Sequence, residues 1–153
     1  MDKAKLIQKL NQAVALEWGA VLQYNQYAQV LLGEPRKIWE DFFSEASNES
    51  LEHARKFGSR IVALGGIPTA EPEAIRQTSD LREMLTNSLE LERRAVQVYT
   101  EALEICQDNP AYRNLLEEQI WQETEDVEEL EKYLNQISKV VAAPAGKRAA
   151  KSA

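Results

Sequence analysis

Proline positions constrain the fold of this chain more than any other feature of its sequence. Five prolines leave four long proline-free runs, at positions 1–34, 36–67, 73–109 and 111–143. Proline ends or kinks a helix because its ring clashes with the preceding turn and its nitrogen has no hydrogen to donate. Each run has the length of one long helix, whereas an all-β chain would need turn residues about every ten positions. The spacing therefore predicts an all-α fold built from four long helices.

Composition and charge then exclude several classes of protein. No window approaches about 18 consecutive apolar residues, so we expect no membrane-spanning helix, and the polar N-terminal segment is unlike a secretory signal. The single cysteine, Cys106, cannot form an internal disulfide, which fits a reducing cytoplasm. A net charge of −7 disfavours nucleic-acid binding. We therefore expect a cytoplasmic protein with neither a membrane nor a nucleic-acid partner.

The chain divides into one domain and a short tail. Residues 1–138 are expected to form an antiparallel four-helix bundle. Residues 67–79 form a connection too long for a simple helical hairpin, which indicates a crossover between the second and third helices, with Ser79 as the N-cap of the third. Residues 139–153 are rich in Ala, Lys and Gly, and no acid follows Glu131. We expect this basic tail to be disordered.

An acidic residue interrupts the apolar stripe of every predicted helix. Glu17, Glu92 and Glu123 each occupy a position where the helical period predicts a hydrophobic residue. The second helix carries Glu49 and His53, the only histidine, at the corresponding place. Asp126 follows Glu123 by one turn, on the same helix face.

Three interpretations account for these acids: they are solvated, they pair with Lys or Arg, or they bind metal. Solvation is the usual state of any single glutamate. The joint pattern favours metal, because four helices carry a carboxylate at mid-length and in phase with the apolar stripe. This is the arrangement of a carboxylate-bridged di-metal site inside a four-helix bundle. Carboxylates with one imidazole suit Fe(II), with Mn(II) as the alternative.

Four segments carry a resemblance to the ferritin-like superfamily, and within it to bacterioferritin. The segments are LEWGAVLQYNQYA (16–28), ESLEHARKFGSRIVALGGIP (49–68), LELERRAVQVYTEAL (89–103) and WQETEDVEELEKYL (121–134). The second is the most specific, because it contains both the His-Ala dipeptide and the glycine-proline exit from the helix. The resemblance covers roughly residues 6–137.

The ligand motif of the family is Glu-x-x-His in the second and fourth helices, and this chain departs from it twice. Ser50 stands three residues before His53, so the adjacent Glu49 is the candidate substitute. Asp126 stands where the fourth helix would carry histidine. The two changes compensate in charge, because Glu17, Glu92, Glu123 and Asp126 together balance two divalent ions. The resemblance therefore implies a di-iron site made by Glu17, Glu49, His53, Glu92, Glu123 and Asp126.

Two further features of the family are expected to be absent. Bacterioferritin binds haem through a methionine near the second-helix histidine, and Leu51 stands there in this chain. The family's large shells use a short fifth helix, whereas residues 140–153 contain Pro144, Gly146 and little apolar periodicity. We therefore expect no haem, and a homodimer or larger homo-oligomer in preference to a cage.

The function that the resemblance implies is oxidation of Fe(II) by O2 or H2O2, a ferroxidase-type oxidoreductase activity. Tyr24 lies two turns from Glu17 on the same face and is the candidate hydrogen-bond donor or one-electron donor. One alternative is a structural or interaction module with a metal-free site, in which Arg93 and Arg94 pair with the acids. Another is a di-metal oxidoreductase that acts on a different substrate. Protection of DNA by the basic tail has charge as its only support.

Overall fold

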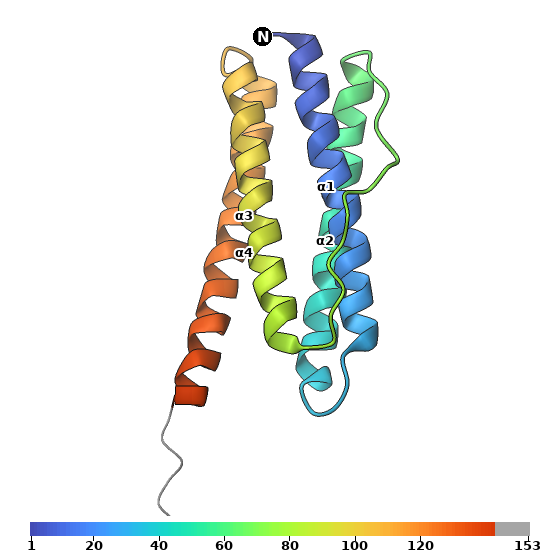
Figure 1. Ribbon diagram of the computed structural model, residues 1–153. Coiled ribbons are helices and arrows are strands. Elements are labelled where there is room, and N and C mark those ends of the chain that lie inside the picture. The colour runs from blue at the N-terminus through green and yellow to red at the C-terminus, as the bar shows by residue number, and fades with distance from the viewer. Residues whose placement is uncertain (143–153) are drawn as a thin grey trace, which may run out of the picture.

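Four long helices form an antiparallel bundle, as predicted. The computed structural model describes residues 1–142 and contains α1 (Lys3–Val30), α2 (Arg36–Ala63), α3 (Leu81–Cys106) and α4 (Pro110–Ala142), with no strand in that range. The segment between α2 and α3 runs back along the bundle beside α1 (Figure 1), so it is the expected long crossover. Helix α4 includes residues 139–142, which the composition had assigned to the tail. The rest of the predicted tail lies outside the described residues.

Local capping determines where the helices begin and end. Asp80, not Ser79, is the N-cap of α3, and its Oδ1 accepts a hydrogen bond from the backbone N–H of Glu83 at 2.9 Å. The prediction of Ser79 was wrong by one residue, because a capping side chain must reach the third backbone N–H of the helix. Helix α2 ends at Ala63, and Gly65 follows its C-cap with a φ of +90°, which suits glycine. The following Gly66 N–H returns to the carbonyl of Ile61 at 2.9 Å.

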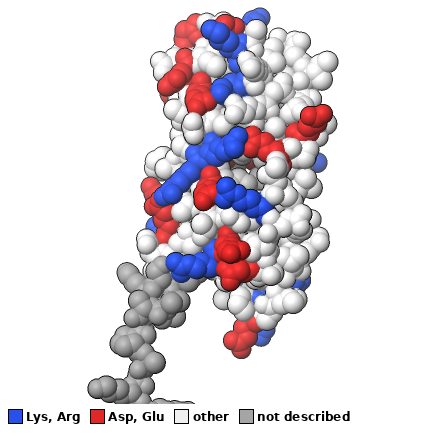
Figure 2. Space-filling model, viewed as in Figure 1, with Lys and Arg blue, Asp and Glu red and all other residues white. Residues whose placement is uncertain are grey.

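The crossover is fastened to α1 along its length. The backbone N–H of Glu73 donates to the carbonyl of Ala15 at 2.8 Å, and the N–H of Arg76 donates to Oε1 of Gln23 at 2.8 Å. Gly19 permits the close approach, since a Cβ there would lie 3.0 Å from the Glu73 carbonyl oxygen. Acidic and basic side chains alternate over this face of the molecule (Figure 2), and Arg94 pairs with Glu73 across it.

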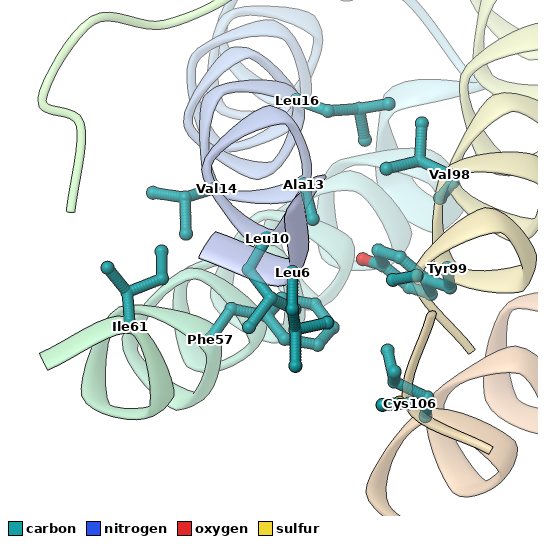
Figure 3. Packing of buried hydrophobic residues seen from close by; sticks show 13 residues of the cluster. Leu6, Leu10, Ala13, Val14, Leu16, Phe57, Ile61, Val98, Tyr99 and Cys106 are labelled. Carbon is teal, nitrogen blue, oxygen red and sulfur yellow. The ribbon is translucent and has the colours of Figure 1, made fainter. Parts of the chain in front are cut away.

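Two apolar clusters fill the bundle, one toward each end. The first includes Phe57 and Tyr99, whose rings lie 4.8 Å apart between centroids (Figure 3). The second includes Phe43, Tyr27 and Met84. The residues between them are buried and polar, and they include Glu17, Ser47, Ser50, His53, Ser88, Glu92, Gln119 and Glu123. The core is therefore interrupted at mid-length by a polar layer to which all four helices contribute.

Helices α2 and α4 do not pack closely against each other, in contrast to the other neighbouring helices. Helix α1 packs against α2 and α3, and α3 packs against α4, with Cα atoms within 8 Å. Within the described residues, α2 and α4 make no such approach. Their separation leaves the polar layer accessible from one side of the bundle. None of the described helices combines the length and apolar character needed to cross a membrane.

Candidate metal centre

Three buried side chains from three different helices meet at the centre of the polar layer. Nδ1 of His53 on α2 lies 2.9 Å from Oε1 of Glu123 on α4 and 3.7 Å from Oε1 of Glu17 on α1. One ligand atom from each of the three falls within 4.8 Å of the others. All three side chains are buried. The structure thus brings together three of the six predicted metal-binding residues in the geometry of a cation site.

Two tyrosines connect the layer to the third helix. The hydroxyl of Tyr24 on α1 donates to Oε1 of Glu92 on α3, and the hydroxyl of Tyr99 on α3 donates to Oε1 of Glu17 on α1. Each tyrosine follows the glutamate of its own helix by two turns. Because α1 and α3 run in opposite directions, each hydroxyl reaches the glutamate of the other helix. Tyr24, which we expected to act beside Glu17, is therefore a hydrogen-bond donor to Glu92.

A cavity of about 170 Å³ extends from this cluster to the surface. Glu92, Glu123, His53 and Tyr24 line its inner part. Four further acids line the outer part between α2 and α4, namely Glu45, Glu49, Asp126 and Glu129. Glu49 is exposed and Asp126 is half-buried, so these two predicted ligands lie nearer the mouth of the cavity than the other four.

Ser50, the main departure from the family motif, is part of this cavity. Its side chain is buried and lines the cavity beside His53. A serine hydroxyl is shorter than a carboxylate and uncharged, so it leaves space and removes one negative charge. Asp126 lines the same cavity from α4. Ser50 therefore lies in the closed inner part of the layer, where it also contacts Glu17, and Asp126 lies in the more open part.

Burial raises the pKa values of the acids in this layer. The pKa of Glu17 rises to about 7, because burial outweighs the opposing contacts with His53. The pKa of Glu92 is held well above its usual range by burial and by the neighbouring charge of Glu123. Burial, with the charges of Glu92 and Glu49, raises the pKa of Asp126 to about 7. The layer therefore holds protons at neutral pH that a bound cation would displace.

His53 is subject to opposing effects. Burial lowers its pKa, while contacts with Glu123 and Glu17 raise it and prevail, which brings the pKa to about 10. Burial raises the pKa of Tyr24 well above its ordinary value, and the charge of Glu92 adds to that rise. The rise at His53 follows from two acids sharing one imidazole, and the rise at Tyr24 follows from burial next to an acid.

The donor set fits a hard divalent cation. Oε1 of Glu123 is buried and has no hydrogen-bond partner, although Nδ1 of His53 lies 2.9 Å away. The contact with His53 is therefore an ion pair without a well-formed hydrogen bond, and a bound cation would take its place beside this oxygen. Arg93 and Arg94, the proposed partners of the acids in the metal-free alternative, pair instead with Glu131 and Glu73 on the surface.

Gln119 is a member of the layer that the sequence pattern did not reveal. It is fully buried on α4, and its amide lies 3.2 Å from Nε2 of His53. Its position one turn before Glu123 on the same helix face is consistent with this burial. A glutamine among many polar residues of this helix has no pattern that separates it from a surface residue.

The chain is similar to known proteins over most of its length. Residues 7–140 match the model of the family described as "Ferritin-like domain". A bacterioferritin of Brucella melitensis is 31% identical over 141 residues, which cover 89% of this chain and 86% of that protein. A bacterioferritin of Desulfovibrio desulfuricans is also 31% identical, over 69% of this chain and 60% of that protein.

A solved structure shows the same likeness in three dimensions. A crystal structure of a "ferritin like, diiron-carboxylate" protein from Bacillus anthracis superposes on this chain with a TM-score of 0.84. The two sequences are 31% identical, and the match covers 88% of this chain and 98% of the other. The fold is therefore shared along almost the whole length of the Bacillus anthracis protein.

Proposed function

Because this chain belongs to the ferritin-like family, we propose that its polar layer binds two iron ions and oxidises Fe(II) with O2 or H2O2. The observation that carries the proposal is the buried group of Glu17, His53 and Glu123, whose ligand atoms lie within 4.8 Å of one another. Carboxylate and imidazole ligands suit Fe(II), and Mn(II) is the alternative ion.

The residues divide naturally between two ion positions. Glu17, His53 and Glu123 would hold one ion at the closed side of the layer. Glu92 and Asp126 line the same cavity and would hold the second ion, with Glu123 shared between the two. Glu49, exposed at the mouth, would bind an entering ion more weakly than the buried carboxylates.

The proposed reaction balances in electrons. Two Fe(II) ions lose one electron each, and these two electrons reduce O2 to H2O2 or H2O2 to water. The protein holds the ligands in place and keeps most water away from them. Tyr24 and Tyr99 orient Glu92 and Glu17 through their hydroxyls, and Tyr24 is the candidate one-electron donor.

An anaerobic titration with Fe(II) tests the proposal. We expect the wild-type protein to bind about two irons per chain, the stoichiometry of a di-iron carboxylate bundle. Glu92→Gln should reduce this number, because it replaces a ligand by a neutral side chain of the same size. Glu90→Gln is the matched control, since Glu90 is an exposed acid on the same helix. Uptake well below two irons, unchanged by Glu92→Gln, would contradict the proposal.

A metal-free structural module is the second candidate, and one observation favours it. Hydrogen bonds from Tyr24 and Tyr99 already satisfy one oxygen each of Glu92 and Glu17. Trp121, with 64% of its surface exposed, would then belong to a partner surface. Chelation distinguishes the two candidates, because only a metal-binding bundle loses stability when metal is removed.

Location, oligomeric state and haem content complete the proposal. We propose that the protein acts in the cytoplasm as a homodimer or larger homo-oligomer. Leu51 in place of the haem methionine argues for a site without haem.

A further inference from the structure

A second cavity lies between α2 and α4, nearer the start of α4 than the candidate metal centre, and its volume is about 380 Å³. The end of α2 and the start of α4 lie at the same end of the bundle (Figure 1). One side of the cavity, which we call the α2 wall, is formed by Lys56, Ser59 and Arg60. The other side, the α4 wall, includes Tyr112, Leu115 and Glu118. This cavity shares no lining residue with the cavity of the candidate metal centre.

The α2 wall carries two cations without an acidic partner. Nζ of Lys56 donates to the neutral amide oxygen of Gln119, and a guanidinium nitrogen of Arg60 donates to Oγ of Ser59 at 3.2 Å. Among the described residues, neither cation forms an ion pair. Lys56 and Arg60 lie four residues apart, so they share a helix face and their like charges repel. An anion bound between them would remove that repulsion.

Most hydrogen-bond donors of the α2 wall are unused. An ammonium group has three N–H donors and a guanidinium group has five. Within the described part of the chain, Lys56 and Arg60 each donate one side-chain hydrogen bond. Ser59 accepts at Oγ, so the proton of its hydroxyl is free to be donated. The α2 wall is therefore able to donate several hydrogen bonds to one cluster of acceptor oxygens.

This donor set fits a phosphate group better than a carboxylate. A phosphate monoester carries a charge of about −1.5 to −2 at neutral pH and three strong acceptor oxygens. A carboxylate has one charge and two oxygens. The fork of a guanidinium binds two phosphate oxygens at once, and an ammonium binds phosphate as a point charge. Arg60 and Lys56 supply one group of each kind.

The α4 wall and the size of the cavity suit an organic group. Tyr112 and Leu115 are half-buried and offer an aromatic ring and an aliphatic side chain. The volume of about 380 Å³ falls within the range of about 300–1,000 Å³ that is typical of small-molecule sites. The cavity is therefore larger than a free phosphate ion requires.

We propose that this cavity binds the phosphate monoester of a small organic molecule. The phosphate contacts the α2 wall, and the organic group packs against the ring of Tyr112 and the side chain of Leu115. Glu118 is the acid in the lining, and its charge weakens the binding of a dianion. It is exposed, so its carboxylate is able to turn toward solvent. This inference goes beyond the proposed function and does not depend on iron binding.

Calorimetric titration of the metal-free protein with phenyl phosphate tests the proposal. Metal is removed with EDTA, and the chelator is dialysed away, because bound iron would itself attract phosphate. At about 0.15 M salt, which screens exposed charges beyond about 8 Å, we expect saturable binding of one molecule per chain. Inorganic phosphate should bind several-fold more weakly, because it leaves the α4 wall without a contact. The absence of saturable binding, or equal affinity for the two ligands, would overturn the proposal.

Two arginines of α2 form a matched pair of variants. Arg55 and Arg60 are both exposed, and of the two only Arg60 lines the cavity. Arg60→Gln should weaken the binding of phenyl phosphate about tenfold or more, the scale of one lost hydrogen bond between charged groups. Arg55→Gln should leave the affinity unchanged. Equal weakening by both variants would mean diffuse attraction to a positive surface, and the inference would fail.

Variants of the α4 wall test the orientation of the ligand. Glu118→Gln should tighten the binding of phenyl phosphate several-fold, because it removes a like charge. Glu117→Gln is the control, since Glu117 is an exposed acid beside it that does not line the cavity. Leu115→Ala should weaken the binding of phenyl phosphate and leave that of inorganic phosphate unchanged. Equal losses for both ligands would contradict the proposed orientation. Failure of iron uptake with phenyl phosphate still bound would count against the proposed function alone.

Discussion

Burying an acidic side chain in this bundle costs desolvation free energy, and specific hydrogen-bond partners reduce that cost. An ionised carboxylate in an apolar core costs several kcal/mol unless it is paired or hydrogen-bonded. Glu17 and Glu92 each accept from a tyrosine hydroxyl on the opposite helix. Glu123 contacts His53 and retains one oxygen without a hydrogen bond. These partners reduce the cost of burying the acids when no metal is bound.

The raised pKa values predict how the metal-free protein responds to pH. Glu17 and Asp126 have pKa values of about 7 when folded, against ordinary values of 4.5 and 3.8. The folded state therefore holds these protons more tightly than the unfolded chain, and the stabilisation is lost as pH rises through about 7. We expect the melting temperature of the stripped protein to fall between about pH 5 and pH 8.

Substitution of one acid checks the origin of this pH dependence. Glu17→Gln removes one of the two linked protons, so it should flatten the fall in melting temperature. Glu104→Gln, at an exposed position on α3, should leave the slope unchanged. A melting temperature that rises with pH over the same range would show that these carboxylates are ionised in the stripped protein.

For the helices, the sequence predicted the spacing of the apolar residues better than it predicted which side of each helix is buried. On α2, Ile38 is exposed although it is a large hydrophobic residue, whereas Phe43 is buried. The buried face of α2 passes instead through Ser47, Ser50 and His53. Small polar residues on that face hid its position, because hydrophobic periodicity cannot detect them. Helices α1, α3 and α4 carry larger apolar residues around their glutamates, so their faces were easier to identify.

Two glycines in helix interiors should respond to alanine in opposite directions. Alanine favours a helix over glycine by about 1 kcal/mol. At Gly58 the new methyl group would make ordinary contacts of 3.6 Å with Pro68, so Gly58→Ala should stabilise the protein. At Gly19 it would meet the carbonyl oxygen of Glu73 at 3.0 Å, and the hydrogen bond from Glu73 to Ala15 holds that segment in place.

Urea unfolding measures both changes. We expect Gly19→Ala to cost about 1 kcal/mol or more, the scale of one displaced backbone hydrogen bond. Gly58→Ala is its internal control, because both substitutions add the same atom to a helix interior. Stabilisation by both would mean that the crossover moves away from α1 at little cost.

At the scale of the whole molecule, the gap between α2 and α4 determines access to the site. The closely packed helix pairs enclose Glu17 and Glu92, whereas the separated pair leaves a cavity that reaches the surface. Under the proposed function, the acids at its mouth would attract Fe(II), and the same opening would admit the oxidant. The crossover is fastened to α1 and α3, on which Ala15, Gln23 and Arg94 hold it, so it leaves this opening clear.

Metal loading should stabilise the bundle as a whole. A ligand that binds only the folded state at 100 times its Kd adds about 2.7 kcal/mol. For a domain of this size, that corresponds to a rise in melting temperature of roughly 5–10 °C. Calorimetry of the protein with Fe(II) under anaerobic conditions, before and after EDTA, measures it. A melting temperature that is insensitive to EDTA would support the structural module instead.

The sequence by itself determined the four helices, the crossover and the level at which the acids lie. Proline spacing and helical period are local properties, and each is complete within one run of residues. Because these acids also lie near the middle of runs of similar length, the packing of four such helices places Glu17, His53, Glu92 and Glu123 in one layer.

Only the tertiary structure decided how that layer is connected. The exchange of tyrosines between α1 and α3, the buried bridge through Gln119 to Lys56, and the outward position of Glu49 depend on rotations and separations of whole helices. Those rotations result from packing among all four helices at once. No single segment contains that information, because a helix turned by a fraction of one residue keeps the same periodicity and meets different partners.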